Sequence, residues 1–240
     1  MVRRTKADAL ATRHQILDAA EAEFLARGVA HTRLQDVAAA AGVTRGAIYW
    51  HFQDKAELFN AMMERAFLPC EGAAERALMV AGDNPLAQLH EMAVAPLRVL
   101  AESEQVQRVF RIAMHQTEYT EELAPVQERY LEGSGEFQQQ LADALQRAEA
   151  LGWLRPGLSI KAVALGLFAL VDGLMHHWTL RPGGFDLVAC GEAAVRTYVD
   201  GLRAALPQAA AEAASGVTAA TSAAPAPAPP APRSRPAPSI

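Results

Sequence analysis

The chain has 240 residues, 51% of them hydrophobic, and a formal net charge of −5 at pH 7. This length and apolar content are sufficient to bury a core, and they fit one small domain plus a larger one. The N-terminus shows no charged-then-apolar leader, and the two cysteines, Cys70 and Cys190, lack CxxC or metal-ligand spacing. We therefore expect a cytoplasmic protein with reduced thiols and no structural zinc.

The negative charge is unevenly distributed along the chain. Residues 1–55 hold eight Lys or Arg and six Asp or Glu, a balance of +2. The other residues hold 14 basic and 21 acidic side chains, a balance of −7. This distribution predicts a basic arm over residues 1–8, which contains Arg3, Arg4 and Lys6 and can approach phosphate, and an acidic remainder that phosphate repels.

Helical periodicity dominates the chain, and no segment has the alternation of a convincing strand. We predict helices over 8–27, 34–41, 45–51, 55–80, 85–101, 104–117, 121–151, 159–180 and 187–205. The predicted fold class is therefore all-α. An N-terminal three-helix domain occupies residues 1–55, and a larger helical domain follows over 56–206.

Two short predicted helices meet at Gly42. Thr32 is placed as an N-cap of the first, with Gln35 three residues later completing a capping box. Gly42 can take the positive φ of a helix C-terminus, Val43 can pack in the elbow, and Thr44 can cap the second helix. This pattern predicts a helix-turn-helix with a very short turn.

The second of these helices presents an unusual outer face. Its expected inward residues are Ala47, Ile48 and Phe52, so the outward or terminal positions are left to Arg45, Gly46, Tyr49, Trp50 and His51. Core packing normally hides aromatic rings, so their outward placement indicates a surface that contacts phosphates and bases. Short helix-Gly-helix elements also occur in helical bundles of other function, and the pattern alone leaves that alternative open.

The stretch from Arg13 to Leu58 resembles the N-terminal domain of the TetR family of bacterial transcriptional regulators. The resemblance rests on the 16–24 helix pattern, the Arg27-Gly28-Val29 exit, the Ala41-Gly42-Val43-Thr44 turn, and the GAIYWHF helix followed by Asp54-Lys55. The opening MVRRTK and the GAIYWHF helix further resemble the branch that represses operons for tripartite multidrug efflux pumps. Beyond about residue 70 the resemblance is confined to scattered positions.

The resemblance implies a homodimeric repressor that binds a palindromic double-stranded DNA operator. Thr44, Arg45, Tyr49 and His51 would contact phosphates and the groove, while Lys55 and Thr32 would steady the helix ends through phosphate contacts. The full set of expected DNA-binding residues is Thr32, Arg33, Thr44, Arg45, Gly46, Tyr49, Trp50, His51 and Lys55. Activation instead of repression, and control of an operon unrelated to efflux, remain open.

The apolar run from Ile160 to Leu180 is long enough to span a bilayer. Asp172 near its middle argues against a membrane. The family resemblance implies instead that helices 159–180 and 187–205 pack against their counterparts in a four-helix bundle across a two-fold axis. Leu174, Trp178 and Val199 could lie in that seam or in the internal core.

The resemblance also implies that the larger domain holds a cavity for a hydrophobic small-molecule effector. Expected lining residues are Leu89, Met92, Ala93, Phe110, Ala113, Met114, Phe137, Leu141, Phe168, Val171 and Asp172. Met and Phe form adaptable walls, although each apolar residue could equally be ordinary core. Asp172 could orient a ligand hydroxyl or amine, or could accept a hydrogen bond from a neighbouring His, Arg or Tyr.

Other functional classes find little support. Neither His90 with His115 nor His176 with His177 completes a metal-ligand set, and the chain has no GxSxG, phosphate-loop, HExxH or GxGxxG motif. We therefore expect no metal, no cofactor and no enzymatic activity. A helical carrier of small molecules without DNA binding is the competing interpretation.

The composition changes from residue 207 onward, where eight of the fourteen prolines lie among alanines and serines. Ala and Pro bury too little apolar area to offset the entropy of ordering. We expect a disordered tail over 207–240. An adaptor-binding role for it is the alternative to a passive tail.

Overall fold

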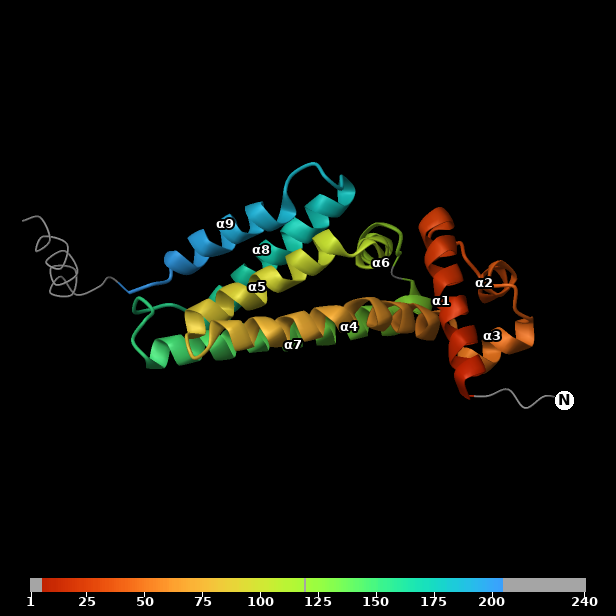
Figure 1. Ribbon diagram of the computed structural model, residues 1–240, viewed down its shortest axis with the longest axis horizontal. Coiled ribbons are helices and arrows are strands. Elements are labelled where there is room, and N and C mark those ends of the chain that lie inside the picture. The colour runs from red at the N-terminus through yellow and green to blue at the C-terminus, as the bar shows by residue number, and fades with distance from the viewer. Residues whose placement is uncertain (1–5, 119, 205–240) are drawn as a thin grey trace, which may run out of the picture. The chain divides into compact units, whose positions relative to one another are not determined.

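The computed structural model describes residues 6–118 and 120–204, without the side chains of 67–75, 77, 78 and 80. The predicted arm residues Arg3 and Arg4 and the tail over 207–240 lie outside this range. The helices are α1 (Lys6–Arg27), α2 (Leu34–Ala40), α3 (Arg45–His51), α4 (Lys55–Ala81), α5 (Pro85–Glu102), α6 (Glu104–His115), α7 (Ala124–Ala150), α8 (Ile160–Leu180) and α9 (Leu187–Asp200), with a 3-10 turn, η1 (Glu121–Leu123), before α7 (Figure 1).

The all-α prediction is confirmed, and most predicted helix ends agree within a few residues. Capping side chains explain this agreement: Asp54 accepts from Glu57 N at the start of α4, and Asn84 accepts from Leu86 N at the start of α5. The prediction of one helix over 121–151 is wrong at its start, because a 3-10 turn precedes Pro125, which stands in the first turn of α7.

The last predicted helix is also shorter than expected. Helix α9 ends at Asp200, and the following residues turn back toward the segment before α8. There Leu154 and Arg203 form an isolated antiparallel bridge, with Arg155 N donating to Leu202 O at 2.9 Å. Within the described part of the chain this bridge is the only β-type pairing outside the helices, so the backbone of 202–204 is paired without a strand.

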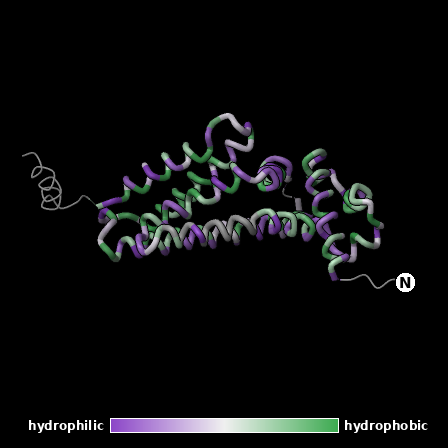
Figure 2. Tube along the Cα trace, viewed as in Figure 1, coloured by the Kyte–Doolittle hydropathy of each residue, from purple (hydrophilic) through white to green (hydrophobic). Residues whose placement is uncertain are grey.

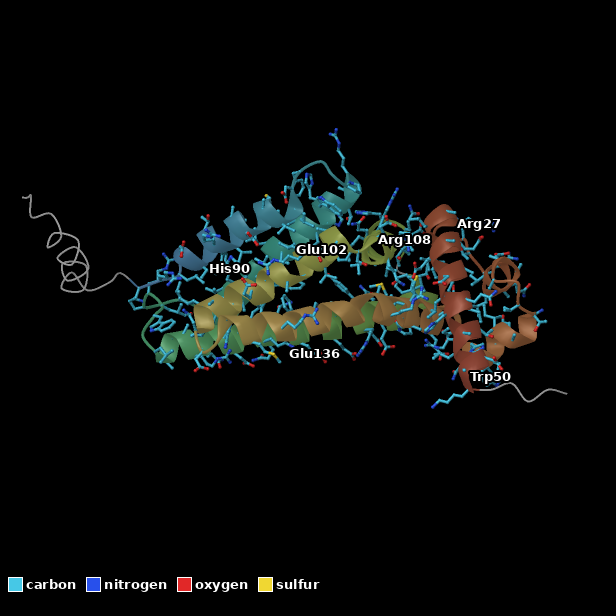
Figure 3. All side chains as sticks on the ribbon, in the orientation of Figure 1. Arg27, Trp50, His90, Glu102, Arg108 and Glu136 are labelled. Atoms are coloured by element: carbon cyan, nitrogen blue, oxygen red, sulfur yellow. The ribbon has the colours of Figure 1, made fainter. Side chains whose placement is uncertain are left out.

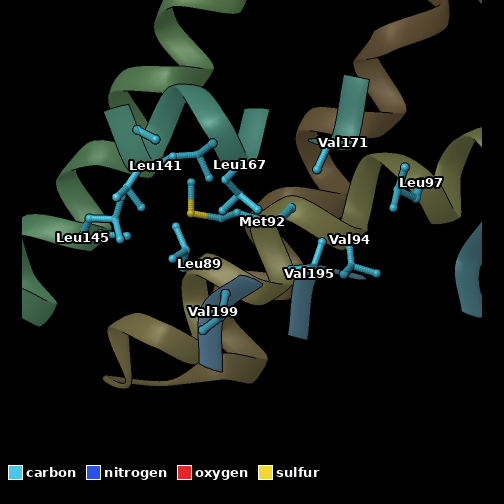
Figure 4. Packing of buried hydrophobic residues seen from close by; sticks show 14 of the residues in the cluster. Leu89, Met92, Val94, Leu97, Leu141, Leu145, Leu167, Val171, Val195 and Val199 are labelled. Carbon is cyan, nitrogen blue, oxygen red and sulfur yellow. The ribbon is translucent and has the colours of Figure 1, made fainter. Parts of the chain in front are cut away.

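Two apolar clusters hold the helices together. The head cluster joins α1, α2, α3, the N-terminal part of α4 and one face of α6, with Ile16, Phe24, Ile48 and Phe59 at most 1% exposed. The body cluster joins α5, α7, α8, α9 and the other face of α6; Figure 4 shows Met92 of α5 facing Leu141 and Leu167 of the neighbouring helices. Hydrophobic and hydrophilic residues alternate along the helices, as expected of amphipathic packing (Figure 2).

Candidate nucleic-acid interface

The turn between α2 and α3 has the predicted geometry. Gly42 adopts φ +65°, where an L side chain is strained, and Val43 N donates to Ala38 O at 3.0 Å to close the end of α2. Thr44 then caps α3, since its Oγ1 accepts from Ala47 N at 3.2 Å. The short turn holds α3 rigidly at an angle to α2.

Helix α3 is anchored by its inner face. Ile48 is fully buried and Phe52 is 1% exposed, and the guanidinium of Arg13 lies 5.1 Å from the centroid of the Phe52 ring. Ala47 is half-buried. The inward prediction for these residues is confirmed, and it leaves the opposite face of the helix available to a partner.

The outer face of α3 carries the exposed rings. Trp50 is 72% exposed and Tyr49 is 44% exposed, and Figure 3 shows Trp50 at the surface of this helix. The guanidinium of Arg45 lies 5.8 Å from the centroid of the Tyr49 ring, and the His51 ring meets Trp50 edge-on at 4.5 Å. Large rings of this kind are rarely left in water without a function, so the face is suited to recognition.

Other predicted site residues in the head are also exposed, namely Arg33, Thr44, Arg45 and Gly46. Arg33 and Arg45 supply guanidinium groups, and Thr44 supplies a hydroxyl. With the amide donors of the first turn of α3, these groups are the usual partners of phosphate oxygens and base edges. The surface therefore combines cationic, hydrogen-bonding and aromatic groups on one rigid element and its neighbour.

The structure does not support the predicted phosphate contacts of Thr32 and Lys55. Thr32 is fully buried and its Oγ1 donates to Gly28 O at 2.8 Å, so it closes the loop after α1. The N-cap of α2 is Arg33, one residue later than predicted, and Asp36 rather than Gln35 completes the return contact by accepting from Arg33 N at 3.0 Å.

The second correction concerns Lys55. Its side chain is only 7% exposed, and its Nζ lies 2.9 Å from Glu122 Oε2 and donates to Ala30 O at 3.5 Å. The ammonium group of Lys55 is buried and already paired with a carboxylate and a carbonyl, so it is not available to a phosphate. Lys55 instead links the start of α4 to η1 and to the loop after α1.

The candidate ligand-binding residues largely gather in one place. Phe110, Met114, Phe137 and Phe168 either belong to the body cluster or pack against it, and the Phe137 and Phe168 rings lie 6.3 Å apart. Leu89, Met92, Ala93, Leu141 and Val171 are buried in the same cluster. Ala113 is different, because it belongs to the head cluster. A ligand role for this set stays a prediction.

Asp172 is half-buried on α8 and has internal partners. The hydroxyl of Tyr130 donates a hydrogen bond to it, and His176 lies one turn further along the same helix. Burial raises the pKa of Asp172, against the opposing effects of His176 and of the Tyr130 hydrogen bond. The structure thus provides the tyrosine partner that the sequence left open, while a ligand contact by Asp172 stays a prediction.

His115, at the end of α6, is hydrogen-bonded through its ring, whereas His176 and His177 of α8 are exposed. The hydroxyl of Thr179 donates to His176 O at 2.9 Å, so His115 Nε2, at 3.0 Å, is the donor to Thr179 Oγ1. Burial lowers the pKa of His115, and His176 and Arg111 lower it further. Among the described residues, no group of three or more His, Cys, Asp or Glu is arranged to hold a metal ion.

Helices α8 and α9 leave an apolar surface uncovered. Of the helices described, α8 is the one long and apolar enough to cross a bilayer by length and composition, yet only 28% of its most apolar window is buried. A shallow groove on these helices is lined by Leu170, Cys190, Ala193, Ala194, Thr197 and Tyr198. Trp178 and Val199, for which the sequence left both the seam and the internal core open, belong to the body cluster at 7% and 3% exposure, and the partly buried Leu174 packs against that cluster.

The fold and this surface define a helix-turn-helix DNA-binding protein with a larger helical C-terminal domain. Residues 16–62 match the bacterial regulatory proteins of the tetR family, and residues 84–204 match the C-terminal region of MAATS-type transcriptional repressors. The chain belongs to the TetR family of transcriptional regulators.

Similar proteins support this assignment over nearly their whole length. The transcriptional repressor BepR of Brucella suis is 40% identical over 85% of this chain and 97% of its own. The crystal structure of NalD, the secondary repressor of the MexAB-OprM multidrug efflux pump in Pseudomonas aeruginosa, has a TM-score of 0.75 at 38% identity, covering 82% of this chain and 98% of NalD. A complex of SmeT, a repressor from Stenotrophomonas maltophilia, with triclosan has a TM-score of 0.69 at 34% identity, covering 81% and 92%.

Proposed function

We propose that this protein is a cytoplasmic homodimeric repressor of a multidrug efflux operon, which leaves its operator when a hydrophobic small molecule binds. The observation that carries the proposal is the outer face of α3, where Tyr49, Trp50 and Arg45 are exposed on a helix anchored by fully buried Ile48. Efflux control is supported by the similarity to NalD and SmeT, both repressors of such pumps.

The DNA-reading set follows from the exposed residues of the head. It consists of the exposed Arg33, Thr44, Arg45, Gly46, Tyr49 and Trp50 together with the half-buried His51, without the buried Thr32 and Lys55. Arg33 and Thr44 are suited to phosphate oxygens, because each is an exposed N-cap residue with a hydrogen-bond donor in its side chain. Arg45 and Tyr49 are suited to the major groove, where a guanidinium and a phenol can donate to base edges.

Dimerisation through α8 and α9 is supported by the apolar groups that a single chain leaves in water. Leu165 is 51% exposed and Leu180 is 60% exposed, and the groove between the two helices is lined mostly by small or apolar side chains. A second copy would cover this surface by an isologous contact. The two heads would then enter major grooves roughly 34 to 36 Å apart, or a small multiple of that distance.

The effector site is proposed within the body cluster, among the Met and Phe side chains of α5, α6, α7 and α8. Polarizable, adaptable side chains accept varied apolar guests, and SmeT has been crystallised with triclosan, a hydrophobic aromatic compound. Asp172 and Tyr130 would supply the polar contacts of an otherwise apolar site. Filling it changes operator affinity only as far as the ligand prefers one conformation of the dimer.

Selection of duplexes from a random-sequence pool by the wild-type chain tests DNA recognition. We expect enrichment of a palindrome, and loss of about 1 to 3 kcal/mol of binding energy for that duplex in Arg45→Ala. Arg129→Ala is the matched control, since Arg129 is an exposed arginine of α7 paired within its own helix. Absence of any enriched palindrome would overturn the proposal and favour a carrier.

Footprinting with a panel of hydrophobic aromatic compounds tests release. The compounds, triclosan among them, are ranked first by the thermal shift that they produce in the protein. We expect release by those stabilising compounds that prefer the head spacing of the DNA-free dimer, because such a ligand weakens operator binding by the amount of that preference. A footprint that survives every stabilising compound would refute ligand release.

Sedimentation of Ala193→Arg tests the dimer surface. A guanidinium in the middle of the groove places like charges against each other across a two-fold axis, so we expect a monomer with a strongly weakened operator complex. Gln140→Arg adds the same charge at an exposed position of α7 and should remain dimeric. A dimeric Ala193→Arg variant would place the interface elsewhere.

A further inference from the structure

A buried carboxylate interrupts the apolar stripe of α1. Glu21 is 4% exposed, although its helical neighbours Leu17, Ala20 and Phe24 are all fully buried core residues. A carboxylate in such a position is costly unless charged or hydrogen-bonding partners surround it. Glu21 takes no part in the proposed DNA contacts, because those contacts lie on α3 and at the start of α2.

The partners of Glu21 come from two other helices. Arg65 of α4 donates through Nη2 to Glu21 Oε1, and Gln105 of α6 donates to the same oxygen at 3.0 Å. Arg108 of α6 places its Nε 3.6 Å from Glu21 Oε2, and Figure 3 shows Arg108 beside α1. One carboxylate therefore joins α1, α4 and α6.

The attachment of α1 to α4 does not depend on Glu21 alone. Arg65 Nη1 also lies 2.8 Å from Asp18 Oδ1 and donates to His14 O at 3.3 Å, so Arg65 contacts α1 at two further residues. The contacts of Glu21 with Gln105 and Arg108, by contrast, are the hydrogen bond and the ion pair that tie it to α6. What Glu21 adds to the α1–α4 pair is therefore its connection to α6.

Helix α6 touches both the candidate ligand region and the head. Phe110 is in the body cluster, whereas Val109 and Ile112 on the adjoining face are in the head cluster. The carbonyl of Gln116, just after α6, also accepts from Val29 N at 2.9 Å in the loop after α1. A ligand that displaces Phe110 would move α6, whose first turns contact Glu21 of α1 and whose C-terminal end is hydrogen-bonded to the loop after α1.

Apolar contacts and ion pairs transmit such a movement differently. Apolar packing is non-directional and lets one helix slide over another, whereas charge-assisted hydrogen bonds fix a particular position. We propose that Glu21 is the positioning residue that makes α1, and with it the DNA-reading head, follow the displacement of α6 when a ligand binds. This inference rests on the proposed function and identifies how its ligand and DNA sites are coupled.

Two variants test the inference. Glu21→Gln keeps the side-chain size but removes the charge that holds Arg108 and Arg65. The double variant Gln105→Ala/Arg108→Gln removes the contacts of α6 with Glu21 and leaves the contacts of Arg65 with α1 in place. It therefore tests the role of Glu21 even if Glu21→Gln folds poorly. Glu23→Gln is the matched control, because Glu23 pairs with Arg27 within α1 and, among the described side chains, its carboxylate pairs with no other helix.

The measured quantity is the ratio of operator Kd with and without ligand, for the palindrome selected by the wild type. The ligand is triclosan, or the panel compound that releases the wild type best. In a wild type released about 30-fold, we expect Glu21→Gln and the double variant to be released less than about 10-fold, with ligand Kd in the absence of DNA changed by less than about twofold. Glu23→Gln should be released like the wild type.

Reciprocity supplies an internal check. In each variant, saturating operator DNA should weaken ligand binding by the same factor by which the ligand weakens operator binding, because coupling between two sites is symmetric in free energy. That factor should be smaller in both variants than in the wild type. Wild-type release ratios in Glu21→Gln and in the double variant would overturn the role of Glu21 while leaving the proposed function intact. A wild type that selects no palindrome, or that no compound releases, would instead overturn the proposed function, and the inference with it.

Discussion

Adjacent residues of α3 should respond oppositely to truncation. Ile48 is fully buried in the head cluster, so Ile48→Ala removes core atoms and leaves a cavity, which costs about 2 to 5 kcal/mol of unfolding free energy. Tyr49 is 44% exposed on the outer face, so Tyr49→Ala should change stability by only about 0.5 kcal/mol. Its loss should appear in DNA binding, at about 1 to 3 kcal/mol.

Urea unfolding and titration of the selected palindrome separate the two effects. We expect Tyr49→Ala to keep the wild-type midpoint and to bind the palindrome about 5- to 150-fold more weakly, the fold-change that corresponds to about 1 to 3 kcal/mol. Ile48→Ala should lower the midpoint, and its folded fraction should retain a larger share of operator affinity than Tyr49→Ala does. Wild-type operator affinity in Tyr49→Ala would refute the argument that the exposed rings of α3 face DNA.

Two glycine substitutions test the backbone and packing arguments. Gly42→Ala should lower stability by about 1 to 2 kcal/mol, because φ +65° strains an L residue. Steric overlap plays no part, since no described atom outside the turn lies within 4 Å of the place that the new Cβ would take. An unchanged melting temperature would show that the turn can adopt another conformation. Gly191→Ala should lower stability by about 1 to 3 kcal/mol, because the new Cβ would overlap Leu97 Cδ1 between α5 and α9; a neutral result in urea unfolding would mean that buried Leu97 can move aside.

Local chemistry explains which elements the sequence could predict. The turn at Gly42, the Thr44 cap and the Asp54 cap each depend on residues within four positions of one another, and the structure has all three. The pattern at Thr32 failed because its buried hydroxyl donates to Gly28 O, four residues earlier in the same loop, and the helix begins one residue later. A capping pattern cannot reveal such a competing partner.

Contacts between distant segments account for the remaining differences. Lys55 finds Glu122, 67 positions away in sequence, and Trp178, for which the sequence left the seam and the core open, lies in the body cluster. Periodicity marks a face as apolar but does not say which helix covers it. Glu21 is a further clue in the pattern, beside Asp172, because a carboxylate within the stripe of Leu17, Ala20 and Phe24 needs partners from elsewhere.

The half-buried carboxyl of Asp172 gives a pH-dependent prediction. Burial raises its folded pKa above that of the unfolded chain, so its contribution favours folding most below the unfolded pKa and declines as the pH rises through the folded pKa. At neutral pH the ionised group therefore opposes folding. Asp172→Asn, which removes the ionisation, should melt at a higher temperature than the wild type at pH 7.5, with a difference that shrinks toward pH 4.

Thermal melts of both proteins across this range measure the difference, with Asp143→Asn as a control on the exposed side of α7. The control should give a small difference that does not grow with pH in the same way. A wild type more stable than Asp172→Asn at pH 7.5 would mean that Tyr130 and His176 stabilise the carboxylate more than burial disfavours it. If the predicted sign is found, the chain retains an acidic group that weakens its own fold beside the candidate effector site, as expected of a residue kept for binding rather than for stability.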